Sequence, residues 1–531
     1  MALDTKIKAS NLFSRSDVQE IRSRGISCKQ VLQQLERFKK GFPKPKLARP
    51  CFPGDGVVVL AKADQKRCIL KFQTAAARGR AMKFVPASGA ASRMFKAPST
   101  VLEQYRDLDL NQLRRLAGQD HDVKTTLQIF RNIEKFAFCD DLKLLLKKRG
   151  LDFKSLLAEG KWQTILENLL QPQGLNYQNE PKCLIPFHRD PDDAKTAFEE
   201  HLIEASAYVA TGKKARVHFT IQPCFQDEIC QLADQLIRKY QKRGMRFDIS
   251  FSVQDPATDM VALDKDHRLL RDHNGRIVFR PAGHGALIEN LNRLKADILF
   301  IKNIDNVAHA RFQSACFDYK KALGGYLLEL EETIHTYLKG LQKGSVSKDL
   351  FNRVILFLKQ KLCIDLPKKF KEFNQREQKK YLFSRLHRPL RVCGVVRNEG
   401  EPGGGPFWVE DARGEWSLQI IEAAQVAYEK PEQKSIWQSS KYFNPVDLIC
   451  SLRDHKKRPF NLKHFVDDNM GMIAQKTEGN REIKGLELPG LWNGSMAGWN
   501  TVFVEVPLFT FNPVKTIEDL LRPAHQPQGR G

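Results

Sequence analysis

The feature that most constrains the fold is an alternation of apolar runs and helical stretches between residues 183 and 303. The apolar runs are CLIPF (183–187), ARVHFTI (215–221), RFDISFSV (246–253) and DILFIKN (297–303), and helical patterns cover 194–211, 225–243 and 285–294. Strands separated by helices of this length are typical of a mainly parallel sheet with helices on both faces. We therefore expect a three-layer α/β/α core with a mainly parallel mixed sheet, in which MVALD and RIVFR frame a hairpin turn at DHNGR.

The rest of the chain divides into segments of different pattern. Residues 16–40 have helical spacing with Ser16 as a possible cap, and the stretch GFPKPKLARPCFPGDG marks a boundary. Helical patterns fill 99–170 and 308–388, and short strands with Gly, Pro and Asn loops follow. These patterns predict an N-terminal helical region (1–80), an α/β core (81–325) with a helical insertion (97–175), a helical segment (326–388) and a C-terminal α+β region (389–531).

Bulk composition favours a soluble protein of several domains. The chain has 531 residues, of which 42% are hydrophobic, so two to four domains are expected. No apolar run reaches bilayer length and the first residues lack a signal peptide's apolar core, so we expect a cytoplasmic protein without a membrane partner. The eleven cysteines are scattered without a CxxC pair, which argues for reduced thiols rather than disulfides or a zinc site.

The chain is strongly basic, with a formal net charge of +24. Such an excess attracts anionic partners, including nucleotides, sugar phosphates and nucleic acid. Much of it lies in helical stretches such as DLPKKFKEFNQREQKK (365–380), where a solvated helix face is the simpler interpretation. Direct nucleic-acid binding is not favoured, because no aromatic-studded basic strand or zinc finger accompanies the charge.

A loop of small residues follows a short β-like run at Lys83 to Val85. In the sequence PASGAASRM (86–94) the loop ends at Arg93. Such a loop lets backbone amides approach a phosphate, with a basic side chain to balance its charge. Alone, the same loop is also compatible with a plain tight turn between a strand and a helix.

Four further blocks follow predicted strands, where ligands bind in open α/β sheets. They are EPKCLIPF (180–187), QDPATD (254–259), FRPAGHGAL (279–287) and KNIDN (302–306). In order and content, the five blocks resemble the nucleotidyltransferases that join a nucleoside triphosphate to a sugar phosphate, especially UDP-sugar pyrophosphorylases. Pro86 to Met94 resembles their PAAG-x-G-[ST]-R-M loop, Pro181 to Leu184 their PK-x-L block, Gly283 to Gly285 their GHG turn, and Asn303 to Asn306 their N-[IV]-DN sequence. With ELPGLWNG (487–494), the set also looks like an uncharacterised bacterial family distantly related to these enzymes.

The resemblance implies a Rossmann-like, GT-A-like core and a role for each block. Arg93, Lys182 and Asp305 would be catalytic: Arg93 would neutralise the leaving pyrophosphate, Lys182 would hold the attacking or the α-phosphate, and Asp305 would bind Mg²⁺. The nucleotide would contact the loop residues Ala87, Ser88, Gly89, Ala90, Ala91 and Ser92, with Gln254, Gly283, His284 and Gly285 at the base and ribose. The implied reaction joins a nucleoside triphosphate, UTP by resemblance, to a sugar 1-phosphate or similar acceptor and releases pyrophosphate.

The sequence departs from the family pattern in two places. Ala91 stands where the loop usually has a second glycine, which requires that Ala91 have negative φ and a methyl group directed away from the phosphates. Nearly ninety residues separate the loop from Lys182, so the ends of the helical insertion must lie next to each other.

Each residue also has a structural alternative. Arg93 and Lys182 could be surface charges, Asp305 could cap a helix beginning at Asn306, and His284 could be a satisfied turn histidine. A second metal ligand could be Asp447 or Glu505, but Asp447 could bond a turn at Pro445 and Glu505 could pair with a Lys or Arg. Trp492, Trp499 and Asn493 suit sugar binding or a buried aromatic corner.

Two other functions stay open. A catalytically inactive nucleotide- or RNA-binding protein on the same fold is consistent with Ala91, and an enzyme of this fold could use a non-sugar acceptor. The sequence does not indicate the oligomeric state.

Overall fold

A computed structural model describes residues 12–190, 193–344, 346–400, 403–411, 413–478 and 481–527. The chain forms two compact units, each assembled from separate segments. Unit 1 comprises Met1–Cys68, Ser252–Leu299 and Leu323–Glu505, and unit 2 comprises Ile69–Phe251, Phe300–Ala322 and Val506–Gly531. The chain passes between the units within α4 (Lys62–Ala77), β8 (Arg246–Val253), β11 (Ile298–Ile301) and α14 (Ala310–Leu341), and again after β18 (Asn500–Glu505).

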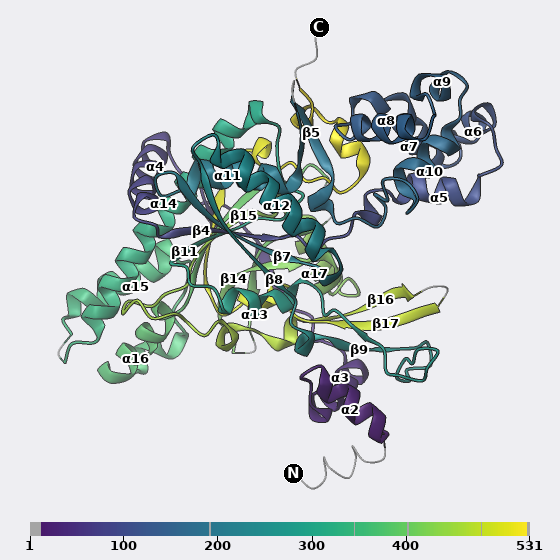
Figure 1. The fold of residues 1–531 in the computed structure, drawn as a ribbon. Coiled ribbons are helices and arrows are strands. Elements are labelled where there is room, and N and C mark those ends of the chain that lie inside the picture. Colours follow the sequence, from purple (N-terminus) through teal and green to yellow (C-terminus); the bar gives the residue numbers. More distant parts are fainter. Residues whose placement is uncertain are drawn as a thin grey trace. The chain divides into compact units, whose positions relative to one another are not determined.

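Unit 2 contains a sheet with strand order β11-β4-β7-β8 (Figure 1). β4 (Ala81–Pro86) and β7 (Lys214–Ile221) pair in parallel. Beyond β11, the amides of Lys302 and Ile304 donate to the carbonyls of Phe84 and Pro86. α11 (Ala197–Tyr208) packs on the sheet through Phe198, whose ring stacks on Phe219 of β7 at a centroid distance of 4.1 Å. α12 (Gln226–Gln241) then connects β7 to β8.

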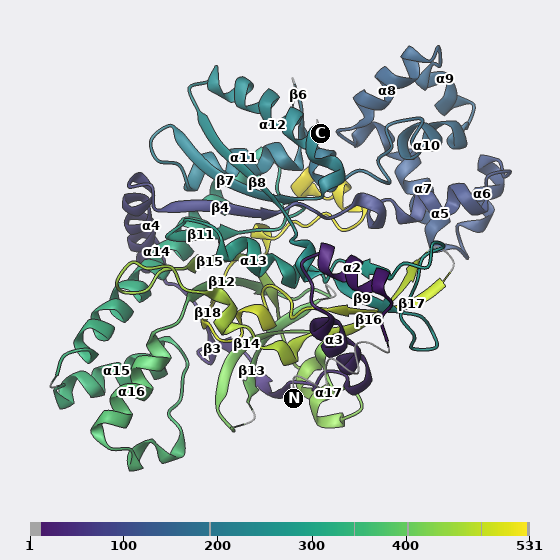
Figure 2. The same cartoon turned by 60° about the horizontal axis from the view of Figure 1, so that its bottom comes forward.

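Between β4 and the block at Lys182, unit 2 contains a cluster of short helices, drawn in blue in Figures 1 and 2. Their bounds are α5 (Lys96–Gln104), α6 (Leu110–Leu116), α7 (His121–Arg131), α8 (Cys139–Lys148), α9 (Phe153–Ala158) and α10 (Trp162–Leu170). The base of this insertion is aromatic: Phe138 stacks on Phe136 and packs edge-on against Phe95 and Tyr177. A hairpin of β5 (Pro186–Asp190) and β6 (Asp193–Thr196) follows the Lys182 block.

Unit 1 has strands in the order β2-β3-β18-β12-β15 and two smaller sheets, β1-β13-β14 and β10-β9-β17-β16. β12 pairs in parallel with β18 and antiparallel with β15, and β3 pairs in parallel with β18. The strand bounds are β1 (Lys46–Pro50), β2 (Phe52–Pro53), β3 (Gly56–Val58), β9 (Met260–Leu263), β10 (Phe279–Arg280), β12 (Leu390–Arg397), β13 (Gly404–Glu410), β14 (Trp416–Glu422), β15 (Tyr442–Ser451), β16 (Met472–Glu478) and β17 (Arg481–Glu487).

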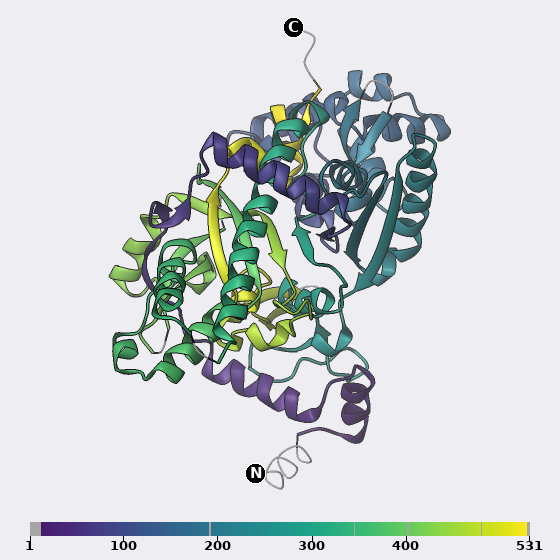
Figure 3. The same ribbon diagram turned by 90° about the vertical axis from the view of Figure 1, so that its left-hand side faces the viewer.

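The helices of unit 1 are α2 (Arg15–Ser23), α3 (Cys28–Lys40), α13 (Leu287–Asn292), α15 (Lys348–Lys361), α16 (Gln375–Leu386) and α17 (Pro431–Gln438). Apolar side chains of α2 and α3, among them Ile21 and Val31, share a buried cluster with Val261 of β9 and Leu486 of β17. Figure 2 shows α3 close to β9. α15 and α16 lie side by side, as the green helices of Figures 1 and 3 show. In the part of the chain described here, no helix is both long and apolar enough to cross a bilayer.

The expected α/β class with a mainly parallel mixed sheet is confirmed, as are the strands at 215–221 and 246–253 and the helix between them. The pairing of MVALD with RIVFR is also confirmed, since Val261 pairs with Phe279. CLIPF, however, does not form a strand of the main sheet: Lys182–Leu184 is a 3-10 turn, and β5 begins at Pro186 in a separate hairpin. The cap of α2 is Ser14, not Ser16, because the Ser14 hydroxyl accepts the Asp17 amide.

Candidate functional site

The small-residue loop leaves β4 at Pro86 and leads into a 3-10 turn at Ala91–Arg93. Two of its amides are bonded within the protein: Ala87 donates to Thr220 O and Ala91 donates to Glu180 O. The amides of Ser88, Gly89, Ala90 and Ser92 donate to no acceptor among the described residues. Unused main-chain N–H groups in such a loop are suited to bind the oxygens of a phosphate.

Ala91 meets the condition that the sequence imposed on it. Ala91 does not have a positive φ, and its side chain is fully buried. At Gly89, by contrast, an added Cβ would meet no atom within 4 Å. The methyl group of Ala91 therefore packs into the protein, and the surface of the loop at Gly89 stays open.

The block at Lys182 lies directly beside this loop. Ala90 and Pro181 form an isolated antiparallel bridge, in which the Lys182 amide donates to Gly89 O at 3.1 Å. The required closeness of the two ends of the insertion is therefore confirmed. The insertion leaves the core and returns to it at neighbouring points.

Lys182 and Asp305 form the centre of the site. The Lys182 ammonium donates to Asp305 Oδ2 and to the carbonyl of Val514, both at 2.7 Å. Lys182 is 8% exposed, so it is not a surface charge. Asp305 does not cap a helix from Asn306, since α14 begins only at Ala310. The loop, Lys182 and Asp305 thus come together in unit 2.

Arg93 is placed differently. Its side chain is exposed, and it makes no hydrogen bond or ion pair with any part of the chain that the structure describes. It stands in the same 3-10 turn as Ala91, one residue after the Ser92 amide. Its assignment to the pyrophosphate stays a prediction.

The residues predicted at the base and ribose lie in unit 1. Gln254 follows β8 and donates to the Thr258 hydroxyl at 3.3 Å. His284 Nδ1 accepts the Leu491 amide at 3.0 Å, and its ring stacks on Trp492. A Cβ at Gly285 would meet the Pro489 carbonyl at 2.1 Å, so the close approach there is to the protein's own backbone. Their contact with a nucleotide stays a prediction.

The two candidates for a second metal ligand also belong to unit 1. Asp447 is buried in β15 opposite Gly394, and Pro445 lies within the same strand, next to a break in its register with β12. Whether Asp447 binds a metal or bonds the backbone near Pro445 stays a prediction. Glu505 pairs with Arg397 at 3.4 Å.

The indole of Trp499 and the side chain of Asn493 are buried, whereas Trp492 is half-buried. Asn493 donates to the Glu422 carboxylate at 3.1 Å and to the Gln425 side chain at 3.2 Å. Trp499 therefore fits the alternative of a buried aromatic corner better than Trp492 does.

Comparison with known proteins assigns the chain to a family. The family model described as "Domain of unknown function (DUF4301)" matches residues 14–526. The chain belongs to the DUF4301 family. No curated protein sequence matches it significantly.

Two solved structures with a similar fold to the DUF4301 chain are sugar-nucleotide enzymes. One is the uridine diphosphate N-acetylglucosamine pyrophosphorylase from Trypanosoma brucei in complex with an inhibitor, at 12% identity and a TM-score of 0.46, covering 96% of this chain and 79% of that one. The other is a UDP-glucose pyrophosphorylase variant from Leishmania major in complex with UDP-glucose, at 11% identity and a TM-score of 0.42, covering 96% and 78%.

Sequence reasoning missed a buried charge cluster behind the loop of this DUF4301 protein. Glu204 of α11 accepts the ammonium groups of Lys83 in β4 at 2.6 Å and of Lys302 after β11 at 2.7 Å. Burial is the main cause that lowers the pKa of Lys83 to about 7, against the opposing effect of Glu204. Burial raises the pKa of Glu204, but Lys302 and Lys83 together hold it well below its ordinary value. The sequence does contain a sign of this cluster, because Lys83 and Lys302 each stand in an apolar run that predicts a strand.

The second missed feature is the C-terminal segment. Besides the Val514 carbonyl on Lys182, the Val514 amide donates to Asp305 O, and the Ile517 amide donates to Met94 O near the loop. Asn306 forms an isolated bridge with Pro513. Backbone contacts of this kind leave no sequence signal, because any residue supplies the same carbonyl.

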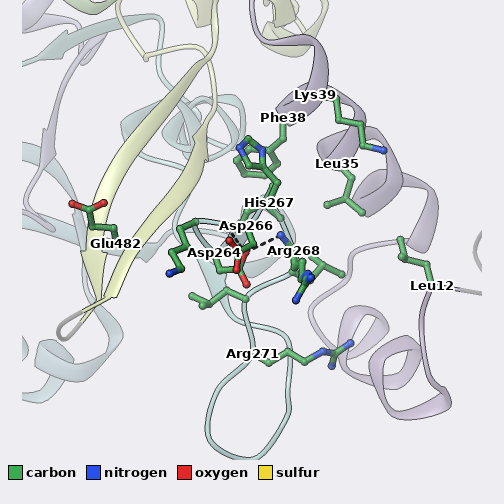
Figure 4. Close-up of a pocket in the computed structure, with 14 residues that line it drawn as sticks. Leu12, Leu35, Phe38, Lys39, Asp264, Asp266, His267, Arg268, Arg271 and Glu482 are labelled. Atoms are coloured by element: carbon green, nitrogen blue, oxygen red, sulfur yellow. Dashed lines mark hydrogen bonds between the residues drawn. The ribbon is translucent and has the colours of Figure 1, made fainter.

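A pocket of about 1020 Å³ in unit 1 contains none of the predicted site residues. Figure 4 shows it between α3 and the loop from Asp264 to Arg271, with Glu482 on the opposite strand. Asp264 accepts the amides of Asp266 and Arg268, and Arg271 pairs with Asp17. These charged groups stabilise the loop and its contact with α2.

Proposed function

We propose that the DUF4301 protein is a Mg²⁺-dependent nucleotidyltransferase that joins a nucleoside triphosphate to a sugar 1-phosphate or similar acceptor and releases pyrophosphate. The observation that carries the proposal is the meeting of three groups in unit 2: the loop with unused amides, the Lys182 ammonium and the Asp305 carboxylate. They are about 90 and 120 residues apart along the chain, and each belongs to a motif of the resemblance. UTP is the proposed nucleotide because of that resemblance.

The side chains fit the proposed ligands. Asp305 Oδ1 has no hydrogen-bond partner among the described residues, so a carboxylate oxygen, the kind of ligand that Mg²⁺ prefers, is available. When bound, Mg²⁺ would neutralise the charge on the phosphate oxygens. The Val514 carbonyl keeps the Lys182 ammonium in place, so Lys182 can exchange Asp305 for a phosphate oxygen by a small movement.

Nucleotidyl transfer needs placement and charge neutralisation more than covalent chemistry from the protein. The amides of Ser88, Gly89, Ala90 and Ser92 would bind the triphosphate oxygens, and Lys182 would hold the α-phosphate or the attacking phosphate as a point charge. Arg93, exposed at the end of the loop, would neutralise the departing pyrophosphate. A cytoplasmic location belongs to the same proposal and agrees with eleven cysteines that form no disulfide.

The test is a screen of nucleoside triphosphates against sugar 1-phosphates with Mg²⁺, in which released pyrophosphate is measured. We expect Lys182→Ala and Asp305→Ala to reduce the rate at least about 100-fold, the scale on which lost charge stabilisation acts. Lys154→Ala and Asp107→Ala, both exposed in the same unit, are matched controls and should retain full activity. Circular dichroism would verify folding of each variant.

The outcome also separates the alternatives. A nucleotide that binds without turnover, with an affinity unchanged by Asp305→Ala, would contradict catalysis and favour a binding protein. Steeply salt-dependent affinity for RNA would favour the RNA-binding alternative. If pyrophosphate were released only with a phosphorylated acceptor that is not a sugar, the proposed reaction type would stand and the proposed acceptor would be replaced.

A further inference from the structure

Two histidines and an aspartate come together in unit 1, at a place that the proposed reaction does not use. His387 follows α16, and Asp454 and His455 begin the turn after β15. One potential ligand atom from each of the three residues lies within 4.8 Å of the others. Asp454 and His455 are buried, and His387 is half-buried.

One of the distances between the three residues is close to that expected in a tetrahedral site. His387 Nε2 lies 3.8 Å from Asp454 Oδ2. Two ligand atoms at about 2.0–2.1 Å from a tetrahedral Zn²⁺ are separated by roughly 3.3 Å. A shift of about half an ångström would therefore bring this pair into bonding distance.

His455 has a buried nitrogen without a partner. Its Nε2 hydrogen donates to Gln342 Oε1 at 3.0 Å, which leaves the lone pair on Nδ1. Nδ1 is buried and lacks any hydrogen-bond partner. Metal-binding histidines show the same arrangement, in which the outer N–H is held by an oxygen while the inner nitrogen faces the ion.

Asp454 is held in one orientation by hydrogen bonds. Oδ1 accepts the amides of Lys456 and Arg458, and Oδ2 accepts the Arg458 guanidinium. Outer hydrogen bonds are usual for carboxylates that bind a metal. The Arg458 side chain is 64% exposed and can move to accommodate a cation.

A small cavity of about 10 Å³ lies next to Asp454, and it is lined also by His335, Arg388 and Phe460 but not by His387 or His455. Such a volume is about that of one water molecule. Three protein ligands with a water in the fourth position form an established type of zinc coordination.

We propose that His387, Asp454 and His455 bind a divalent transition metal ion, with Zn²⁺ as the preferred ion. Two imidazole nitrogens and a carboxylate oxygen are a ligand set that suits Zn²⁺ better than Mg²⁺ or Ca²⁺, which prefer oxygen ligands alone. The ion would link the turn after β15 to the C-terminal end of α16. The site is independent of the Mg²⁺ proposed at Asp305, which lies in the other unit.

The test uses the full-length protein, stripped with a chelator and titrated with Zn²⁺ by calorimetry, and with Co²⁺ by absorption spectroscopy. We expect saturable binding of one ion, a Co²⁺ spectrum of tetrahedral type and a rise in melting temperature with Zn²⁺. His387→Ala and His455→Ala should each weaken Zn²⁺ binding at least about 10- to 100-fold, since even outer partners of a metal site contribute that much.

The chain provides a matched control in His273. His273 follows Asp272 in the turn DHNGR, as His455 follows Asp454 in DHKKR, and both aspartates accept the amides two and four residues later. His273 is exposed and belongs to no such cluster. His273→Ala should bind Zn²⁺ like the wild-type chain.

Two outcomes would overturn the proposal. One is an equal affinity for Zn²⁺ in wild type, His387→Ala and His455→Ala, and the other is the lack of saturable binding by wild type. Because His387 is half-buried, His387→Ala keeps the test valid if His455→Ala fails to fold.

Discussion

Glu204 is the only carboxylate in the described structure that accepts both Lys83 and Lys302. All three side chains are nearly or completely buried. The two lysines stand on the chain just before the small-residue loop and just before Asp305. One buried carboxylate therefore fixes the two segments from which the candidate site is built.

Glu204→Gln should destabilise the protein strongly. The substitution would leave two buried ammonium groups without their charge partner, a change that typically costs about 3–5 kcal/mol. Lys83→Met should cost less, because Lys302 would still pair with Glu204. Urea unfolding of the variants measures the difference.

The control for this prediction is Glu159→Gln, an exposed glutamate in the same unit, which should change the unfolding free energy by less than about 0.5 kcal/mol. If Glu204→Gln were no less stable than this control, the cluster would not hold the two segments together.

The sequence allows the important side chains of the candidate site to be predicted, but not the groups that they contact. Lys182 and Asp305 could be found because each stands in a motif at the end of an apolar run. Their pairing with each other, and the Val514 carbonyl on Lys182, depend on a segment more than two hundred residues beyond Asp305. The turn at DHNGR could be predicted from Asn-Gly, whereas DHKKR forms a turn with Lys457 at a φ of 62°, which its sequence does not indicate.

Among the elements, the helical insertion depends on the aromatic cluster at its base. Phe138 is fully buried and contacts Phe95, Phe136 and Tyr177, with ring centroids between 5.0 and 6.3 Å. Phe95 precedes the insertion and Tyr177 follows α10, so the cluster joins its two ends.

Phe138→Ala should loosen the whole insertion. Removal of a buried phenylalanine typically costs about 3–5 kcal/mol because of lost burial and the cavity that remains. Limited proteolysis should then cleave within residues 97–175 earlier than elsewhere. Leu144→Ala on α8, where the leucine is 55% exposed, should leave the cleavage pattern unchanged, and an identical pattern for Phe138→Ala would contradict the prediction.

The strength of the local pattern decided which elements could be predicted. β7, α12 and β8 have clear apolar periodicity and were found near their true bounds. β1, β2 and β3 were missed, since they are short and lie in a stretch rich in proline and glycine. β3 is nevertheless held by parallel pairing with β18, more than four hundred residues away, and no local pattern encodes such a partner.

The stability of the whole molecule should fall as the pH is lowered, because many of its histidines are buried. Burial lowers the pKa of eight of the thirteen histidines below 6.5, to about 3 for His188 and His525 and about 4 for His218. Between pH 6.5 and these lower values, the unfolded chain binds protons that the folded chain excludes. Stability is therefore lost as the pH falls below 6.5.

The expected loss is about 1.4 kcal/mol per pH unit for each such histidine. Glu200 acts in the opposite sense, because burial raises its pKa to about 7 and the folded state gains a proton there. His188, His218 and His525 together outweigh this single carboxyl group, so the net effect near pH 5.5 is a loss of stability. Urea midpoints at pH 7.5, 6.5, 5.5 and 4.5 would measure this slope, and a constant midpoint down to pH 5 would contradict it.

The interleaving of the two units along the chain has a consequence for synthesis on the ribosome. Neither unit is a continuous stretch, and unit 2 takes its last segment from Val506 onward. The Val514 carbonyl, which accepts the Lys182 ammonium, is therefore synthesised more than three hundred residues after Lys182 itself. Unit 2 can complete its fold around Lys182 only after this intervening chain has been added, and a product that ended before Val506 would lack the last segment of unit 2.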